Sequence, residues 1–250
     1  MNAMYISAEH LPQRAGELLE HVRTQAPRVH CLMNTVVQKL VADGLSALGA
    51  IPSMTSSPEE VAAFVEKADA LSVNLGTLDA SRRQGIAVAA KAAARLGRPW
   101  VLDPAHCDYS PPRAAFAQEL LGQGTTVLRA NAAEHELLAV PESIISIRTG
   151  EADRVSLGRD SLTIANGHPL MAKVTGTGCL SGAVAAAFLA VTVDRFAASA
   201  SAMLAMGVAA EIAAEHARGP GTFEPALLDA LAGLTTEDII TRARVLDDEG

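Results

Sequence analysis

The sequence predicts an α/β fold in which a mostly parallel sheet is covered by helices on both faces. Short apolar runs of strand character alternate with Ala- and Leu-rich stretches of helical spacing, beginning at residue 29. The helical stretches are about ten to fifteen residues long, a length that suits a crossover between parallel strands. We find no linker, repeat or low-complexity segment in this alternation, so we expect one domain over residues 1–250.

The first half of the chain is predicted to contain four strands with helices between them. A helix over 36–48 is indicated by its apolar spacing and by Gly49, since glycine commonly follows a helix end. Ser57, Pro58 and the two glutamates after them are typical of a helix start. A further helix over 81–96 ends at Gly97. The four strands are expected at 29–32, 51–54, 70–73 and 99–102.

The second half of the chain begins with the same alternation and then changes. Two strands are expected to flank a polar connection that carries Glu151, Asp153 and Arg154, and we expect them to form an antiparallel edge. After Gly176 the chain is predicted to be almost wholly helical, and residues 247–250 are expected to fray. The expected helices are 114–121, 131–138, 179–193, 196–218 and 224–231, and the expected strands are 125–128, 143–148 and 161–165.

Composition excludes several classes of protein. The net charge of −8 argues against nucleic acid or an anionic membrane as the main partner. Three widely spaced cysteines without a CxxC motif are not a disulfide framework, which favours a reducing cytoplasm. The N-terminus lacks the pattern of a signal peptide, and the longest apolar stretch, 183–193, is too short to span a bilayer. We therefore expect a soluble cytoplasmic protein.

Ligands of parallel α/β sheets bind beyond the carboxyl ends of the strands. The polar and glycine residues that follow the predicted strands are therefore candidates for the site. They are Asn34, Asn74, Gly76, Asp103, Arg129, Asn131, Thr149 and Gly150.

The segment Gly176-Thr177-Gly178-Cys179 precedes a long apolar helix. Glycines allow a ligand to approach the backbone closely, and the free N–H groups of a helix start bind anions. Negative charge on a transferred phosphate would be stabilised there, and the pKa of a thiol there is expected to be lowered. The segment is neither a Walker A loop nor a full GxGxxG motif. The alternative is an ordinary helix start with a small buried cysteine.

Two acids and one arginine could serve phosphate chemistry. Asp103 closes a predicted strand and could hold Mg²⁺, although Asp-Pro is also a common turn. Glu134 could orient a metal-bound water or simply cap the helix that begins near Asn131. Arg129 could bind a phosphate or lie at a solvated strand end.

Two histidines were also weighed as ligands. His30 lies in an apolar run, which favours a hydrogen-bonded core histidine. His106, Cys107 and Asp108 all carry metal-binding atoms, but three consecutive residues rarely converge on one ion. A dedicated zinc site is therefore not expected.

Taken together, the segments resemble the hydroxyethylthiazole kinase family of the ribokinase-like superfamily. The matching stretches occur in the order of the family and cover most of the chain. They are VHCLMNTVVQKLVADGLSALGAIPSM (29–54), ALSVNLGTL (70–78), LDP (102–104), LRANAAE (128–134), TGE (149–151), VTGTGCLSGAVAAAF (174–188) and GPGTF (219–223).

The resemblance implies a three-layer α/β/α ribokinase-like fold, a mostly parallel central sheet, and phosphorylation of 4-methyl-5-(2-hydroxyethyl)thiazole by ATP with Mg²⁺. It implies a homotrimer with substrate sites between subunits. Cys179 would be the catalytic residue, in a position where most of the superfamily has Asp. The other implied roles are thiazole binding by Met54, Asn34 and Gly176, ATP binding by Arg129 and Thr149, and Mg²⁺ binding by Asp103 and Glu134.

Three features depart from the pattern of the family. Asn34 is followed by Thr35 instead of a second Asn, and residues 105–109 replace a small glycine-rich stretch. The segment 134–149 is shorter than usual, and a helix on the nucleotide side is expected to be missing. Two alternatives stay open: a kinase of another small alcohol such as a hydroxymethylpyrimidine, and a homologue that binds a thiazole without catalysis. Met54 and Cys179 favour the thiazole.

Overall fold

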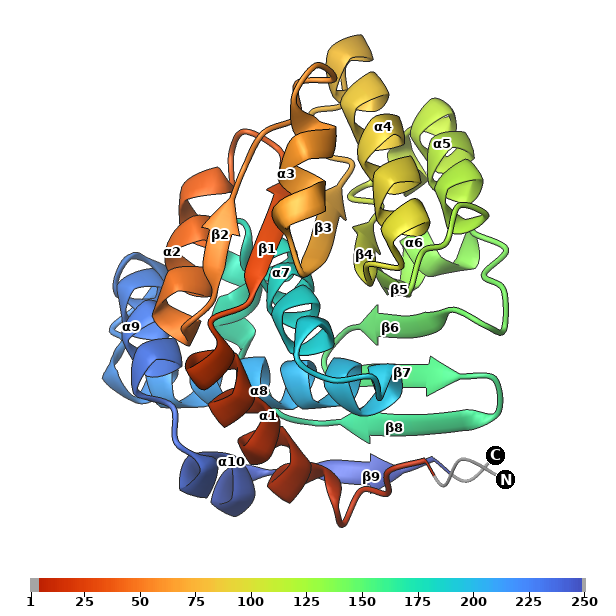
Figure 1. Cartoon of the computed structure of the whole chain (residues 1–250). Coiled ribbons are helices and arrows are strands. Elements are labelled where there is room, and N and C mark those ends of the chain that lie inside the picture. The colour runs from red at the N-terminus through yellow and green to blue at the C-terminus, as the bar shows by residue number, and fades with distance from the viewer. Residues whose placement is uncertain (1–4, 249–250) are drawn as a thin grey trace.

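The computed structural model describes residues 5–248 as one nine-stranded sheet with helices on both faces (Figure 1). The strand order is β2-β1-β3-β4-β5-β6-β7-β8-β9. Neighbouring strands from β2 to β6 are parallel, and those from β6 to β9 are antiparallel. The strands are β1 (Arg28–Leu32), β2 (Ile51–Ser53), β3 (Ala70–Asn74), β4 (Trp100–Asp103), β5 (Val127–Asn131), β6 (Ile145–Thr149), β7 (Asp153–Leu157), β8 (Asp160–Ile164) and β9 (Val245–Asp247).

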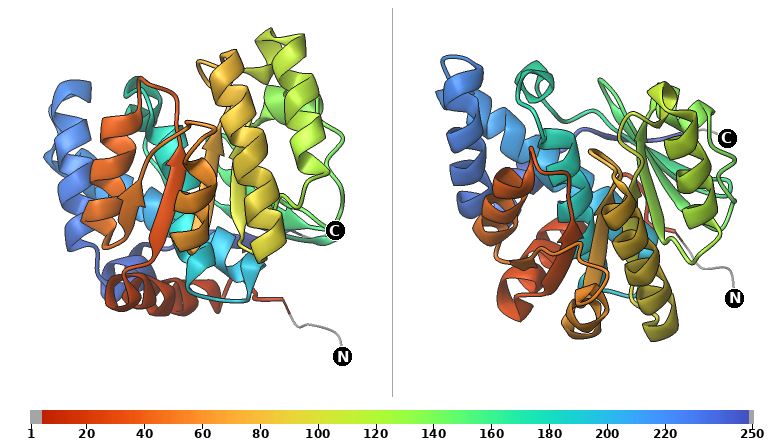
Figure 2. Two further views of the ribbon diagram at one scale, coloured as in Figure 1. Left: turned by 45° about the horizontal axis from the view of Figure 1, so that its top comes forward. Right: turned by 90° about the horizontal axis from the view of Figure 1, so that it is seen from above.

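The helices form two layers, one on each face of the sheet, as the different views show (Figure 2). One hydrophobic core lies under α1, α2 and α7–α10, and a second lies under α3, α4 and α5. The predicted three-layer arrangement with a mostly parallel sheet is therefore confirmed. The helices are α1 (Leu11–Gln25), α2 (Gln38–Leu48), α3 (Val61–Lys67), α4 (Ala80–Leu96), α5 (Pro111–Leu121), α6 (Ala132–Glu136), α7 (Thr177–Ala190), α8 (Arg195–His216), α9 (Pro220–Gly233) and α10 (Thr236–Arg242), with short 3₁₀ helices η1 (Cys107–Tyr109) and η2 (Pro169–Lys173).

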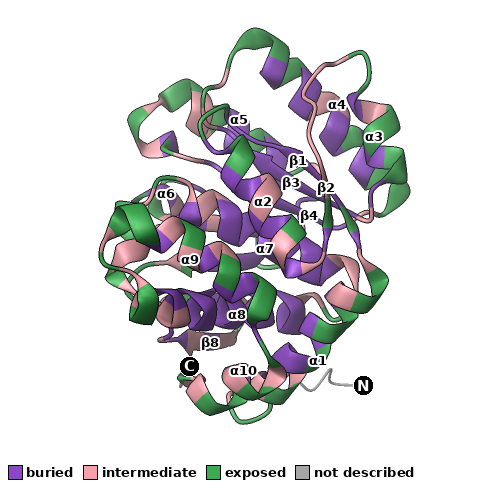
Figure 3. Ribbon diagram, turned by 90° about the vertical axis from the view of Figure 1, so that its left-hand side faces the viewer, coloured by how far each residue is buried: buried purple, intermediate pink, exposed green. Residues whose placement is uncertain are grey.

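Helix α7 is buried along most of its length and α8 from Phe196 to Ala210, and in these stretches both helices are apolar on nearly all sides (Figure 3). Their alanines allow the helices to pack closely against the sheet and against each other. By length and composition α8 is the one helix of residues 5–248 that could cross a membrane, but 89% of its apolar window is buried inside the protein. We therefore interpret α8 as a core helix.

Four elements of the structure were not predicted. Helices α1 and α10 and strand β9 were missed, and the polar connection around Asp153 and Arg154 is itself a strand, β7. The sequence of β7 is mostly polar because only Val155 is fully buried. This pattern is typical of a strand near the exposed edge of a sheet. This edge of the sheet is antiparallel as expected, but the two predicted strands do not pair with each other, because β7 lies between them and β9 adds a further strand.

The C-terminal end was expected to fray from residue 247, and this is wrong for residues 247 and 248. Asp247 ends strand β9, which pairs with β8, and its Oδ1 accepts a hydrogen bond from the backbone N–H of Ala8 at 2.8 Å. The carboxylate of Asp248 accepts hydrogen bonds from Thr163 and Ser161 and pairs with Arg154 at 2.9 Å. Residues 249–250 lie outside the described residues.

Candidate active site

Helix α7 begins at a glycine whose backbone few other residues could adopt. Gly176 has φ +100°, and a Cβ atom on it would lie 2.8 Å from Cγ1 of Val37. Thr177 then fixes the turn, since its hydroxyl donates a hydrogen bond to the Met171 carbonyl at 2.8 Å. The predicted glycine turn at a helix start is confirmed, and the N-terminus of α7 points its free N–H groups to the carboxyl ends of the central strands.

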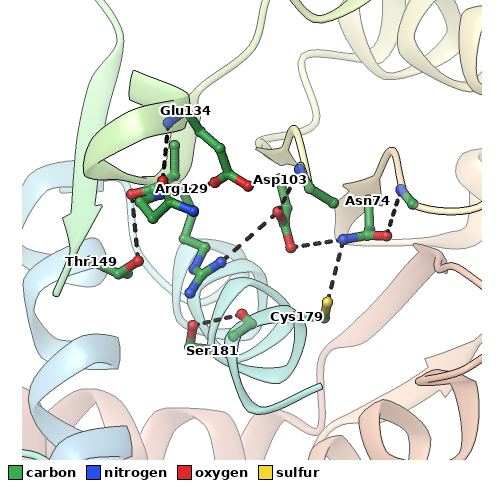
Figure 4. A network of polar contacts seen from close by, with 12 residues as sticks. Asn74, Asp103, Arg129, Glu134, Thr149, Cys179 and Ser181 are labelled. Carbon is green, nitrogen blue, oxygen red and sulfur yellow. Dashed lines mark hydrogen bonds and ion pairs between the residues drawn. The ribbon is translucent and has the colours of Figure 1, made fainter. Parts of the chain in front are cut away.

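Cys179 lies in the first turn of α7 and contacts a network of amides (Figure 4). The Nδ2 of Asn74 donates to the Sγ of Cys179 at 3.3 Å and to Oδ2 of Asp103 at 2.8 Å. Oδ1 of Asn74 in turn accepts from Nδ2 of Asn34 at 2.9 Å and from the N–H of Gly76 at 2.9 Å. Asn74 therefore connects three of the predicted site residues and has a partner for both ends of its amide.

The prediction that this position lowers the pKa of the thiol is wrong. Burial raises the pKa of Cys179, and the nearby negative charge of Asp103 raises it further, while Arg129 opposes the change only in part. The physical reason is that removal of water disfavours the thiolate more than the helix start favours it. Cys179 is therefore a neutral thiol at neutral pH.

Asp103 ends β4, whereas Arg129 lies in the middle of β5, so the prediction that Arg129 lies at a strand end is wrong; the two side chains face each other. Their closest ion-pair distance is 3.9 Å, and Oδ1 of Asp103 also accepts from the N–H of Ala105 at 3.1 Å. Arg129 packs against the backbone of α7 so closely that a Cβ atom on Gly178 would lie 2.6 Å from its Nη2. Its Nε is buried without a hydrogen-bond partner among the described residues. The guanidinium is thus aimed along the helix start with hydrogen-bonding capacity left over.

Glu134 caps α6, as one of the two predictions for it states. Its Oε2 accepts from the N–H of Asn131 at 2.9 Å, while the N–H of Glu134 donates to Oδ1 of Asn131 at 3.0 Å. Its Oε1 accepts from the N–H of His106 at 2.6 Å. This carboxylate is almost fully buried, at 3% exposure, and it joins α6 to the loop after β4.

Asp103 and Glu134 fit the binding of Mg²⁺ by the chemistry of their donors. Each is a carboxylate with two oxygens, and the hydrogen bonds found on each oxygen leave further lone pairs. Oxygen donors of this kind are those that Mg²⁺ prefers. The cap on α6 and a metal-binding role for Glu134 therefore do not exclude each other.

Thr149 ends β6 opposite Asn131, and its hydroxyl donates to the Ala130 carbonyl at 3.4 Å. Asp153, which was not predicted as a site residue, begins the next strand and accepts from the N–H of Gly150 at 3.2 Å. Burial raises the pKa of Asp153, against the opposing effect of the Arg129 charge. Strand β5 and the ends of β6 and β7 therefore place a cation and an acid beside Thr149.

Met54 lies in the segment after β2, apart from the hydrogen-bond network, and packs against the core. The residues on both sides of it are held by one buried histidine. Nδ1 of His30 is 2.9 Å from the Ser53 hydroxyl, and its Nε2 is 3.0 Å from the Thr55 carbonyl. His30 is thus the hydrogen-bonded core histidine that the sequence predicts, and it fixes the backbone around Met54.

Arg82 was not predicted as a site residue, but it holds the backbone next to the network in place. Its guanidinium is buried and donates to the Met33 carbonyl at 2.6 Å and to the Asn74 carbonyl at 2.9 Å. These bonds connect α4 to the carboxyl ends of β1 and β3, beside Asn34 and Asn74. A single arginine in a helical stretch carries no local signal of such a role, because both acceptors are backbone atoms of distant segments.

The loop after Asp103 departs from a regular backbone. Ala105 and His106 have φ +34° and +58°, in the left-handed region that glycine adopts more readily. Arg113 secures the loop by donating to the Ala105 carbonyl. The described chain then has no helix between α6 and β6, and the shorter length of this segment relative to the family stays a prediction.

Known proteins match this chain in sequence. The model of the hydroxyethylthiazole kinase family matches residues 19–143 and 135–237, and the two matches meet within the segment 134–149. A probable hydroxyethylthiazole kinase of Agrobacterium fabrum is 56% identical over 95% of this chain and 96% of its own length. A hydroxyethylthiazole kinase of Serratia proteamaculans is 39% identical over 90% of this chain and 96% of its own.

Solved structures give the same picture of the fold. The structure of a hydroxyethylthiazole kinase protein from Pyrococcus horikoshii superposes with a TM-score of 0.90 at 36% identity, over 94% of this chain and 99% of that one. An ADP complex of Bacillus subtilis pyridoxal kinase superposes with a TM-score of 0.58 at 14% identity, over 75% of this chain and 92% of that one. The second likeness bears on the fold alone, which is ribokinase-like.

Proposed function

This chain belongs to the hydroxyethylthiazole kinase family, and from that premise we propose that it transfers the terminal phosphate of ATP to the hydroxyl of 4-methyl-5-(2-hydroxyethyl)thiazole. The chain is a phosphotransferase with a ribokinase-like fold. The place of the reaction is the salvage of the thiazole half of thiamine. The single observation that carries the proposal is the position of Cys179, in the first turn of α7, beside Asp103 and the Arg129 side chain.

Phosphoryl transfer needs positioning and charge stabilisation more than a strong base, because its transition state is loose. The N–H groups at the start of α7 would bind oxygens of the transferred phosphate, and Arg129 would neutralise part of its charge. Gly178 leaves room for the guanidinium to lie there. Mg²⁺, when bound by Asp103 and Glu134, would supply further neutralisation of the phosphate charge.

A neutral thiol at Cys179 suits the orientation of the substrate hydroxyl better than the removal of its proton. The Asp103 carboxylate is the acceptor in reach of the same network, since Asn74 bonds both groups. We propose that Cys179 positions the alcohol and that the proton leaves to Asp103 or to the phosphate itself. Met54, Asn34 and Gly176 would contact the thiazole, and Thr149 would join Arg129 at the ATP phosphates.

The proposed assembly is a homotrimer with substrate sites between subunits, in the cytoplasm. Val36 lies two residues after Asn34, and its apolar side chain is 70% exposed. A neighbouring subunit that covers this side chain would also complete the site. Light scattering of the purified protein would give three times the chain mass of 25.9 kDa if the trimer forms. A monomer that is active at low concentration would refute the shared site.

A coupled ADP-release assay with the thiazole alcohol, ATP and Mg²⁺ tests the function directly. ADP release that depends on the thiazole, with none for a hydroxymethylpyrimidine, is the expected result. Release with the pyrimidine alone would move the assignment to another alcohol. Thiazole binding in calorimetry without ADP release would show a binding protein without catalysis.

A further inference from the structure

We propose that His106, Asp108 and Glu134 form a second cation site, which prefers a transition-metal ion because one of its donors is an imidazole. These three residues are called the loop donor set below. The Nδ1 or Nε2 of His106 and one carboxylate oxygen from each acid all lie within 4.8 Å of one another. Two of them come from the loop after β4 and one from α6, so the fold itself brings them together.

The separation of the donors is close to what one ion requires. Donor atoms around a divalent metal are about 3 Å from each other when each bond is about 2.1 Å. A change of side-chain rotamer in His106, whose ring is exposed, would close the remaining gap of about 1–2 Å. The carboxylate of Glu134 stays fixed meanwhile, because two backbone N–H groups bind it.

A second observation is a carboxylate oxygen at this place that accepts no hydrogen bond from residues 5–248. Oδ1 of Asp108 is a buried atom without a hydrogen-bond partner among the described residues. A buried carboxylate oxygen without a donor is unfavourable, and buried charges are normally paired or bind metals. The nearby Arg113 does not meet this need, since its hydrogen bond is made to the Ala105 carbonyl.

Cys107 is excluded from the set although it lies between the other two residues in sequence. Its Sγ is directed to the Glu134 carbonyl at 3.9 Å instead. Three consecutive residues rarely bind one ion, but that is not required here. His106 and Asp108 are alternate residues, and Glu134 on α6 supplies the third donor.

The loop donor set differs from the pair Asp103 and Glu134 in its chemistry. Asp103 and Glu134 offer oxygen alone, which suits Mg²⁺, whereas an imidazole nitrogen suits Mn²⁺, Co²⁺, Ni²⁺ or Zn²⁺. The proposal rests on the proposed function in one respect: an ion at the loop donor set would lie next to the place where we propose that the ATP phosphates bind. Its test needs no turnover.

The experiment is a Co²⁺ titration of the whole protein, without affinity tag, nucleotide or alcohol, followed by visible absorption. The first variant is His106→Gly, because it removes the imidazole while glycine suits the φ of +58°. The second is Asp108→Asn, which keeps the shape of the side chain. The control is His21→Ala, which removes an exposed histidine on α1.

The expected result is one Co²⁺ per chain, bound at least tenfold more weakly by each loop variant and equally well by the control. Absence of Co²⁺ binding to the wild-type protein would overturn the proposal. Unchanged binding in His106→Gly, with loss in Asp103→Asn, would also overturn it, because the ion would then belong to the oxygen pair. Failure of the thiazole assay would leave this titration unaffected, so the two proposals fail separately.

Discussion

The two sides of the candidate site differ in how many of their polar atoms already have partners. On the thiol side, Asn34, Asn74 and Cys179 bond one another, Asn74 uses both ends of its amide, and only Nε of the supporting Arg82 is buried without a partner among the described residues. On the phosphate side, Nε of Arg129 and Oδ1 of Asp108 are buried without partners. The thiol side is therefore preorganised by the fold, whereas the side where we propose that phosphate binds keeps polar atoms available for a charged ligand.

The comparison leads to a rule that can be tested. Substitutions on the thiol side should lower both the free energy of unfolding and the activity, because the network supports the fold. Substitutions on the phosphate side should lower the activity by more than they lower the free energy of unfolding. The predictions below run from the largest expected loss of activity to the smallest.

Arg129→Gln should have the largest effect on activity, because it removes the cation of the phosphate side. We expect kcat/KM for ATP to fall by about a thousandfold, the order found when an arginine that faces a transferred phosphate is lost. The free energy of unfolding should fall by about 1–3 kcal/mol, less than the ~4 kcal/mol that a thousandfold loss of activity represents, because the largely buried pair with Asp103 is long at 3.9 Å and Asp103 keeps two hydrogen bonds. Steady-state kinetics and urea denaturation measure the two quantities. A loss of stability that matches the loss of activity would contradict the comparison.

Asn74→Ala should break the thiol side and lower both quantities. It leaves Asp103 without one donor and Asn34 without its acceptor, so the free energy of unfolding should fall by about 1–3 kcal/mol and kcat by about a hundredfold. Asn166→Ala is the matched control. Asn166 is also buried, and it bonds Glu211, Arg242 and Arg244 at the far end of the sheet. The control should lose similar stability but little kcat at a temperature where both variants are folded.

Gly178→Ala should sharpen the comparison, because the new Cβ would lie 2.6 Å from Nη2 of Arg129. The flexible guanidinium would move to avoid it, and KM for ATP should rise by about tenfold through misplacement of the cation. Gly182→Ala on the same helix is the control, since its nearest neighbour is Cγ1 of Val101 at 3.8 Å. Equal KM values for the two variants would show that Arg129 does not need its present position.

Cys179→Ala should have the smallest effect, a fall in kcat of about tenfold or less with KM for the thiazole nearly unchanged. The reason is that burial and the Asp103 charge raise the pKa of the thiol, so a thiolate base is not available near neutral pH. For the same reason, kcat of the wild-type protein should not rise with pH between roughly 7 and 9, below the raised pKa. A tenfold rise per pH unit in that range, lost in the variant, would identify a thiolate base. Unchanged kcat in the variant would remove Cys179 from the mechanism.

The parts of the site that could be predicted from the sequence follow local rules or the general rule for parallel sheets. Gly176 could be predicted because a left-handed backbone at a helix start requires glycine, and the strand-end residues because parallel strands end at one edge. Asn74 could be named as a candidate but not as the centre of the network. Its partner is fixed by the register of β3 against β4, which places it opposite Asp103.

Other features were beyond sequence reasoning for physical reasons. The direction of the pKa shift at Cys179 depends on burial by residues far along the chain and on the Asp103 charge. The role of Arg82 depends on two carbonyl groups that no side-chain pattern encodes. Strand β7 was missed because its outward residues are polar, as they must be near the edge of a sheet.

The bond between the Ala8 N–H and Asp247 has a further consequence for how the chain can be rearranged. It places two points that are 239 residues apart in the sequence within one hydrogen bond of each other. A short peptide that joins residues beside Ala8 and Asp247 would therefore link these two points while β9 stays paired, and a circular permutant joined there needs no long bridge.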